Sequence, residues 1–240
     1  MKKKSIVFAL FLAGAVILFA GCGIIKASHQ ASSDVVSRSF EPGDFNAINI
    51  GGPYEIIFRQ SERAYVTIEV RESLFDILRV DVRGNALHVS TQANVTGAGN
   101  QKVYVYAPYL EGAVISGLAT ATDWDAVSGE NFSLTASGSA SIKIALDVEN
   151  LSVNSSGSGT ARLSGRSDVV DISRSGSGGV QAFDLQTKNA VVGSSGSGRV
   201  EISVSDSLDV TSSGSGSVRY RGNPIVSQRT SGSGTVSRVE

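Results

Sequence analysis

The C-terminal part of the chain repeats one pattern of apolar and polar positions six times, each time around a Ser-Gly-Ser-Gly turn or its variant Ser137-Gly138-Ser139-Ala140. The first serines of successive turns lie 19, 19, 20, 18 and 18 residues apart. Apolar residues stand five and three positions before the turn, at Phe132, Leu134, Leu151, Val153, Val170, Ile172, Ala190, Val192, Leu208 and Val210. They stand again five and seven positions after it, at Ile142, Ile144, Ala161, Leu163, Val180, Ala182, Val200, Ile202, Val218 and Tyr220.

Apolar residues two apart, with mostly polar residues between them, predict two short strands per repeat, each with one buried face. A flexible linker is also rich in glycine and serine, but it has no reason to keep this register. A fixed period near 19 is typical of stacked coils. We therefore expect an all-β chain in which residues 99–240 form a right-handed parallel β-solenoid with coils of about 18–21 residues.

The turn residues fit this prediction. Glycine adopts φ > 0 without a steric clash, so the two glycines of each turn allow a tight reversal. The serines are expected to stack as a structural ladder. They are not expected to be nucleophiles, because no histidine recurs beside them to act as a base.

The ends of the repeat differ from its middle. In the last coil, Gln228 and Arg238 replace apolar residues, as expected of a polar cap that stops edge-to-edge growth. Ser116-Gly117, 21 residues before Ser137, is expected to be the turn of a degenerate first coil.

Residues 40–98 are expected to form a β-rich N-terminal part against which the solenoid winds. Alternating apolar pairs such as Ile48 and Ile50 are separated by turn sequences such as Gly51-Gly52-Pro53 and Arg83-Gly84-Asn85. One helical turn is expected within residues 72–78.

The ordered combination of three segments resembles a known family. These are Phe45 to Gln60 (FNAINIGGPYEIIFRQ), Gly84 to Val89 (GNALHV) and the repeated Ser-Gly-Ser-Gly coils. Together they are similar to the bacterial family called putative auto-transporter adhesin, head GIN domain, over roughly residues 40–238. The resemblance implies an all-β solenoid on exported or anchored envelope proteins, and it supplies no catalytic residues.

The first residues predict export. Three lysines, an apolar run from Ile6 to Ala20 and small residues before a cleavage site are typical of a signal peptide, here residues 1–21. Leu18 to Cys22 resembles a bacterial lipobox, with Phe19 where an aliphatic residue is usual. We expect lipidation of Cys22, a flexible tether over residues 22–39 and a location on the exported side of a bacterial envelope membrane. The alternative is an ordinary signal peptide with an incidental cysteine.

The amino-acid composition limits the kinds of partner that are expected for this protein. Cys22 is the only cysteine, so no intrachain disulfide is expected. The net charge is −1, with acidic and basic residues mixed and no basic patch with interleaved aromatic residues, which argues against nucleic acid. The expected partners are the membrane, through the lipid, and a surface glycan or an envelope protein.

Candidate chemistry is sparse. The carboxylate pairs Asp123/Asp125, Asp168/Asp171 and Asp206/Asp209 do not recur in matching slots, and the two histidines are far apart, so neither a catalytic site, a metal site nor a cofactor is expected. Weak candidates for a binding surface are Tyr104, Tyr106, Tyr109 and Trp124, although packing over a sheet end explains Trp124 more simply. The preferred function is a non-catalytic adhesin-like binding or structural module. The alternative is a carbohydrate-active enzyme, a polysaccharide lyase or hydrolase.

Overall fold

The computed structural model describes residues 29–30, 34–92, 95–96 and 101–240, and almost all of its regular structure is β-strand. The strands are β1 (His29–Gln30), β2 (Val35–Phe40), β3 (Ala47–Gly51), β4 (Tyr54–Gln60), β5 (Tyr65–Arg71), β6 (Leu78–Arg83), β7 (Ala86–Thr91), β8 (Val95–Thr96), β9 (Gln101–Ala107), β10 (Gly112–Ser116), β11 (Thr120–Trp124), β12 (Val127–Ala136), β13 (Ser141–Gly157), β14 (Thr160–Gly176), β15 (Gly179–Gly196), β16 (Arg199–Gly214), β17 (Ser217–Arg221), β18 (Ile225–Gly232) and β19 (Thr235–Arg238). One short 3-10 helix, η1, spans Glu72–Leu74. None of the described residues belongs to a helix long and apolar enough to cross a membrane.

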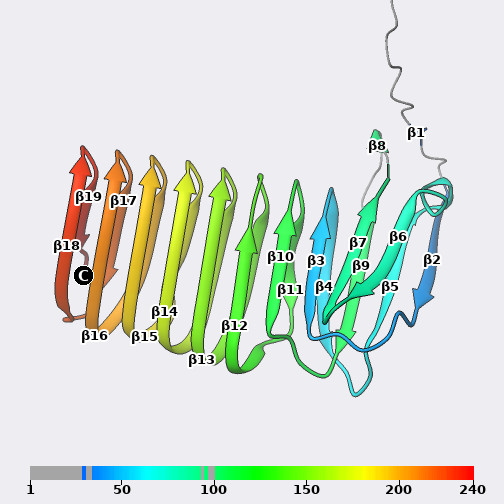
Figure 1. Ribbon diagram of the computed structural model, residues 1–240, viewed down its shortest axis with the longest axis horizontal. Coiled ribbons are helices and arrows are strands. Elements are labelled where there is room, and N and C mark those ends of the chain that lie inside the picture. The colour runs from blue at the N-terminus through cyan, green and yellow to red at the C-terminus, as the bar shows by residue number, and fades with distance from the viewer. Residues whose placement is uncertain (1–28, 31–33, 93–94, 97–100) are drawn as a thin grey trace, which may run out of the picture.

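The chain is a parallel β-solenoid with about 7 turns spaced about 19 residues apart, which confirms the predicted fold class. Each coil contributes one strand segment to each of two rows. The first row runs through β7, β3, β10 and β12, and the second through β9, β4 and β11. Each of the strands β13, β14, β15 and β16 is long enough to bend at a corner and supply a segment to both rows. Figure 1 shows the coils side by side, with β18 and β19 at one end and β2, β5 and β6 at the other.

The hydrophobic core lies between the two rows. Leu151, Val170, Ala190 and Leu208 follow one another in register from coil to coil, and all are buried. Their strand neighbours two residues on, such as Ile172, are equally buried, whereas the residues between them face outward. The alternation in the sequence therefore predicted both the strands and their inward faces.

A column of glycines forms the corner that joins the two rows. Gly117, Gly138, Gly157, Gly176, Gly196, Gly214 and Gly232 all have positive φ. Successive corners are linked by backbone hydrogen bonds such as that from the Ser177 amide to the Gly157 carbonyl, 2.9 Å. A Cβ on Gly176 would approach the Gly157 oxygen to 2.5 Å, so the close stacking itself requires glycine.

The stack extends beyond the expected start at residue 99. Ile115 pairs with Ala136, which confirms the coil predicted at Ser116-Gly117. On its other side β10 pairs with β3, and β3 pairs with β7, so two further coils come from the part expected to be a separate β-rich start. The Gly52 amide bonds to the Ser116 carbonyl at the position of the corner. The sequence Gly51-Gly52-Pro53 was read only as a turn because it lacks the Ser-Gly-Ser-Gly pattern.

Antiparallel strands close the N-terminal end. β2 pairs with β5, β5 with β9, and β6 with β7, and η1 lies between β5 and β6 with Leu74 buried. Residues 35–39, expected as the end of the tether, belong to β2, because Val36 and Phe40 pair with Val70 and Val66. The predicted helical turn is a 3-10 turn of three residues.

The C-terminal end is a bare coil. In the described part of the chain, β18 pairs only with β16, and β19 only with β17. Gln228 and Arg238 continue the inward columns of Val210 and Tyr220, and both are exposed. The polar side chains therefore stand at the positions expected for a cap, where an apolar residue would face solvent.

Candidate functional site

The tyrosine face is an outward patch on β5, β9 and β4 near the N-terminal end of the stack. We define it as Tyr65, Tyr104 and Tyr106 together with Glu55, Arg59, Glu69 and Lys102. Because Val66, Ile68 and Val103, Val105 point into the core, the alternating residues of these strands must point outward. Tyr65 is paired with Tyr106 across β5 and β9, and Lys102 lies between Glu69 and Glu55.

The aromatic residues of this face are held in place by one another and by charged neighbours. The rings of Tyr65 and Tyr106 stack with centroids 4.2 Å apart and planes 5° apart. The Tyr104 hydroxyl donates to Glu69 Oε2 at 3.3 Å. Partial burial, assisted by Tyr65, raises the pKa of the Tyr106 phenol. All three rings are half-buried, so their edges and hydroxyls are offered to solvent on a rigid sheet.

Charged side chains border the tyrosines on one side. Lys102 Nζ lies 3.7 Å from Glu55 Oε2, and this carboxylate raises the pKa of the Lys102 ammonium, which keeps it charged. With Glu69 on the other side, the row alternates in sign across three strands. Such a row offers both donors and acceptors to a polar ligand.

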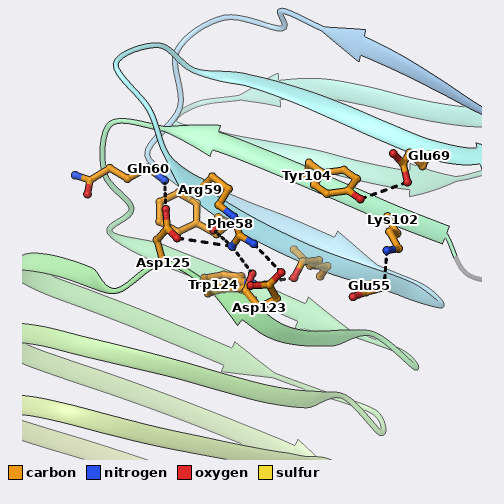
Figure 2. A network of polar contacts seen from close by, with 11 residues as sticks. Glu55, Phe58, Arg59, Gln60, Glu69, Lys102, Tyr104, Asp123, Trp124 and Asp125 are labelled. Carbon is orange, nitrogen blue, oxygen red and sulfur yellow. Dashed lines mark hydrogen bonds and ion pairs between the residues drawn. The ribbon is translucent and has the colours of Figure 1, made fainter.

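Arg59 organises the border between this face and β11. Its Nη2 donates to Asp123 Oδ2 at 2.6 Å, and its Nη1 donates to the backbone oxygens of Phe58 and Asp123, each at 3.0 Å (Figure 2). The hydrogen bond to Asp123 raises the pKa of the guanidinium. Asp125 Oδ1 lies 3.7 Å from Nη1, and its other oxygen accepts from the Gln60 amide. Arg59 therefore uses both carboxylates of the Asp123/Asp125 pair.

Trp124 packs into the structure at the same border. Its Nε1 donates to the Ile56 oxygen at 2.9 Å, and its ring lies 5.6 Å from the Phe58 ring (Figure 2). A register shift between Thr120 and Asp123 brings the indole over this edge. The ring is in contact with the core, which fits packing over a sheet end better than a free sugar platform.

The other sequence candidates lie apart. Tyr109 is 50 % exposed in the connection between β9 and β10, outside the tyrosine face. Cys22 lies outside the described residues. The structure thus has Tyr104 and Tyr106 together on β9. Figure 2 shows Trp124 on the other side of β4 from Tyr104.

The remaining carboxylate candidates are dispersed surface groups. Asp168 pairs with Lys188 at 2.9 Å, Asp209 lies 3.8 Å from Arg229, and Asp206 accepts a hydrogen bond from Ser205. Within the described ranges, no group of three or more His, Cys, Asp or Glu residues is placed to hold a metal ion.

Sequence reasoning missed five members of this face: Glu55, Arg59, Tyr65, Glu69 and Lys102. The sequence could have predicted that these side chains point outward, since each follows or precedes a buried residue on its own strand. What the sequence did not contain was the order of the strands, which places β9 between β5 and β4.

The chain is similar to one protein family and to several solved structures. A family model described as putative auto-transporter adhesin, head GIN domain, matches residues 44–224. A crystal structure of a putative adhesin from Bacteroides fragilis is similar with a TM-score of 0.82 and 24% identity, over 88% of this chain and 100% of that chain. A putative adhesin from Parabacteroides merdae gives 0.70 and 25% identity over 89% and 99% of the two chains.

A third solved structure, a putative lipid binding protein from Parabacteroides distasonis, has a TM-score of 0.73 and 22% identity over 89% of this chain and 100% of that chain. Likeness at such identities shows a shared fold. No curated protein matches the chain.

Proposed function

This chain belongs to the putative auto-transporter adhesin, head GIN domain family, and from that membership we propose that it is a non-catalytic, adhesin-like binding module of the bacterial cell envelope. The observation that carries the proposal is the tyrosine face. It presents a stacked aromatic pair and an alternating row of charges on a flat, rigid sheet. Half-buried tyrosines supply a large contact area at a low cost in conformational entropy, which suits recognition.

The proposed setting is an exported protein anchored through a lipid on Cys22. Residues 1–22 have the lysines, the apolar run and the lipobox-like end that support this setting. The solenoid would then be held off the membrane, with its sheet faces open to ligands. A lipid anchor needs no membrane-spanning helix.

A carbohydrate-active enzyme is the less supported class. The Asp123/Asp125 pair is engaged by one guanidinium, and Asp168 and Asp209 have cationic partners of their own. No specific observation favours hydrolysis or elimination chemistry at any of these positions.

The test is a binding screen on the full chain purified in detergent, against a glycan array and against envelope proteins from the host bacterium. Tyr106→Ser removes one ring of the stacked pair, and Gln181→Ser changes an outward residue on β15, far from the face. We expect a retained ligand to be lost with Tyr106→Ser and kept with Gln181→Ser. A ligand retained equally by both variants would contradict the assignment to this face.

A further inference from the structure

A groove of about 590 Å³ crosses β14 to β17 at the corner opposite the glycine column. Its lining includes Arg166, Thr187, Lys188, Ser203 and Arg221. The volume is in the range of small-ligand sites, roughly 300–1,000 Å³. It lies several coils away from the tyrosine face, so it is a separate feature of the molecule.

The groove exists because one coil is longer than the next. The step from Ser175 to Ser195 is 20 residues, whereas the step from Ser195 to Ser213 is 18. The register of β15 against β16 shifts between Ala182 and Gln186 and again between Thr187 and Asn189. The Phe183 carbonyl, displaced from the ladder, accepts a hydrogen bond from Ser203 Oγ at 2.7 Å. Such bulges re-aim side chains and are common beside functional sites.

One cation of the groove is held in position without an acidic partner. The Arg221 guanidinium lies over the Phe183 ring, 4.3 Å from its centroid, and among the described residues it forms no ion pair. The other two cations are already neutralised, since Lys188 pairs with Asp168 and Arg166 with Asp147. The groove therefore has one uncompensated positive charge, which favours a singly charged anion.

Most of the remaining outward side chains of the lining are polar. Thr187 is 4 % exposed and belongs to the inward column that pairs Ser167 with Thr187 and Thr187 with Val204. Its buried Oγ1, which has no hydrogen-bond partner in the described structure, is therefore out of reach of an occupant. Gln186, Ser205 and Asn223 add amide and hydroxyl groups along the groove. Groups of this kind pair with several hydroxyls on one ligand.

We propose that this groove binds an anionic saccharide, with a sugar carboxylate on Arg221 and sugar hydroxyls on the serine and amide groups around it. A doubly charged anion such as phosphate would leave one charge unbalanced, because Asp168 already pairs with Lys188 and Arg221 is the cation of the lining without an acidic partner among the described residues. This assignment does not depend on the tyrosine face, and the two can fail separately.

The experiment is calorimetric titration of the full chain in detergent with a linear galactose tetramer in which one sugar is galacturonic acid. The comparison ligands are the same tetramer with its single carboxyl group reduced to an alcohol, acetate and inorganic phosphate. We expect the acidic tetramer to bind at least about tenfold more tightly than the reduced tetramer, and neither acetate nor phosphate to compete with it. Equal binding of the two tetramers, absence of binding by the acidic one, or displacement by phosphate would each overturn the proposal.

Variants locate the site. Arg221→Gln should weaken binding of the acidic tetramer about tenfold or more, and Gln186→Ala should weaken it severalfold. The matched control is Arg229→Gln, which removes an exposed guanidinium outside the groove. Because Arg221 is exposed, its variant should fold as the wild type does, which circular dichroism checks. Unchanged affinity in a folded Arg221→Gln protein would refute the assignment.

Discussion

Tyr54 and Gln101 are paired across β4 and β9, and both side chains are buried. In the described part of the chain, the Tyr54 hydroxyl and both amide atoms of Gln101 have no hydrogen-bond partner. Each unpaired buried polar group costs about 1–3 kcal/mol. Three such atoms therefore lie in the described coils nearest the N-terminal cap, whereas the regular coils contain one, Thr187 Oγ1.

The first prediction concerns stability at high pH. Burial raises the pKa of the Tyr54 phenol from its ordinary value of 10.0 to about 12. The unfolded chain loses this proton at a lower pH than the folded one. The contribution of Tyr54 to the free energy of unfolding is therefore fully present below pH 10 and is lost as the pH rises from 10 to 12. The loss is roughly 2–3 kcal/mol. Urea unfolding of wild type and Tyr54→Phe between pH 8 and 12 measures it.

Tyr54→Phe should lose less stability over this range and be equal or more stable at neutral pH, because it removes an unsatisfied hydroxyl. Parallel decline of the two proteins above pH 10 would show that Tyr54 is not the group responsible.

The second prediction concerns the corner glycines. Gly176→Ala places a Cβ against the Gly157 carbonyl at a φ of 99° and should destabilise the protein by more than about 2 kcal/mol. Gly43→Ala has a similar φ of 107° but no atom within 4 Å of the added Cβ, so it isolates the backbone strain. Chemical denaturation should rank Gly176→Ala clearly below Gly43→Ala. Equal losses would mean that the stacking imposes no constraint of its own.

The third prediction tests the inward and outward positions of the first row with two adjacent residues. Val170 is fully buried, whereas Val169 is 44 % exposed. Val170→Asp buries an unpaired carboxylate and should cost about 3 kcal/mol or more, while Val169→Asp should stay within about 0.5 kcal/mol. Thermal melting measures both variants. Similar melting temperatures would show that the assignment of Val170 as inward and Val169 as outward is wrong.

The fourth prediction concerns a buried guanidinium. Arg174 is 3 % exposed and stands in register between small residues, Ala136 and Ser155 on one side and Ser194 and Ser212 on the other. It donates to Ser194 Oγ at 2.7 and 3.2 Å and to the Gly176 oxygen at 2.8 Å, and burial lowers its pKa. Its charge has only neutral partners in the described chain. Arg174→Met should therefore leave the free energy of unfolding within about 1 kcal/mol of wild type or raise it.

Ser194→Ala should lower the free energy of unfolding more in the wild type than in the Arg174→Met background. In the wild type, the substitution removes the hydroxyl that accepts hydrogen bonds from the charged Arg174 guanidinium. A double-mutant cycle by urea unfolding measures the difference. A loss above about 3 kcal/mol for Arg174→Met alone would show that the guanidinium is a net stabilising group.

The fifth prediction concerns Cys22. If its thiol is acylated, the wild-type protein should partition into the detergent phase, and Cys22→Ala should remain an unprocessed precursor or be released. The fold of residues 40–240 should be unchanged. Detergent partitioning and intact mass check this, and a soluble wild type with a free thiol would refute the lipid anchor.

The repeated coils were predictable because, in each coil, the apolar residues beside the turn indicate which positions point inward. The apolar residues around Ser156 and Ser175 mark the same inward columns that the structure shows. The placement of β3 was not predictable, because Ile48 pairs with both Leu87 and Ala113, and nothing in the local sequence specifies partners so distant. Such pairings depend on tertiary packing.

The candidate site was predictable only in part. The alternation of Tyr104 and Tyr106 with Val103 and Val105 indicated an outward pair of rings. Their neighbour Tyr65 comes from a strand that joins antiparallel to β9, which the parallel repeat did not suggest. The burial of Arg174 was equally hidden, since arginine at a serine position gives no local sign of where its charge lies.

The position of β3 and β4 bears on how the molecule is assembled and how its length can change. These strands are made before β7, β9 and β10, yet they lie between them in the stack. The coil of β3 and β4 is therefore the second of the rod, although it precedes the first one in the sequence. Its neighbours on the two sides both come from later segments of the chain, whereas from β12 to β19 each coil pairs with the coil before it in the sequence. We therefore expect the addition or removal of a whole coil to be tolerated between β13 and β16 and to disrupt the stack at β3 and β4.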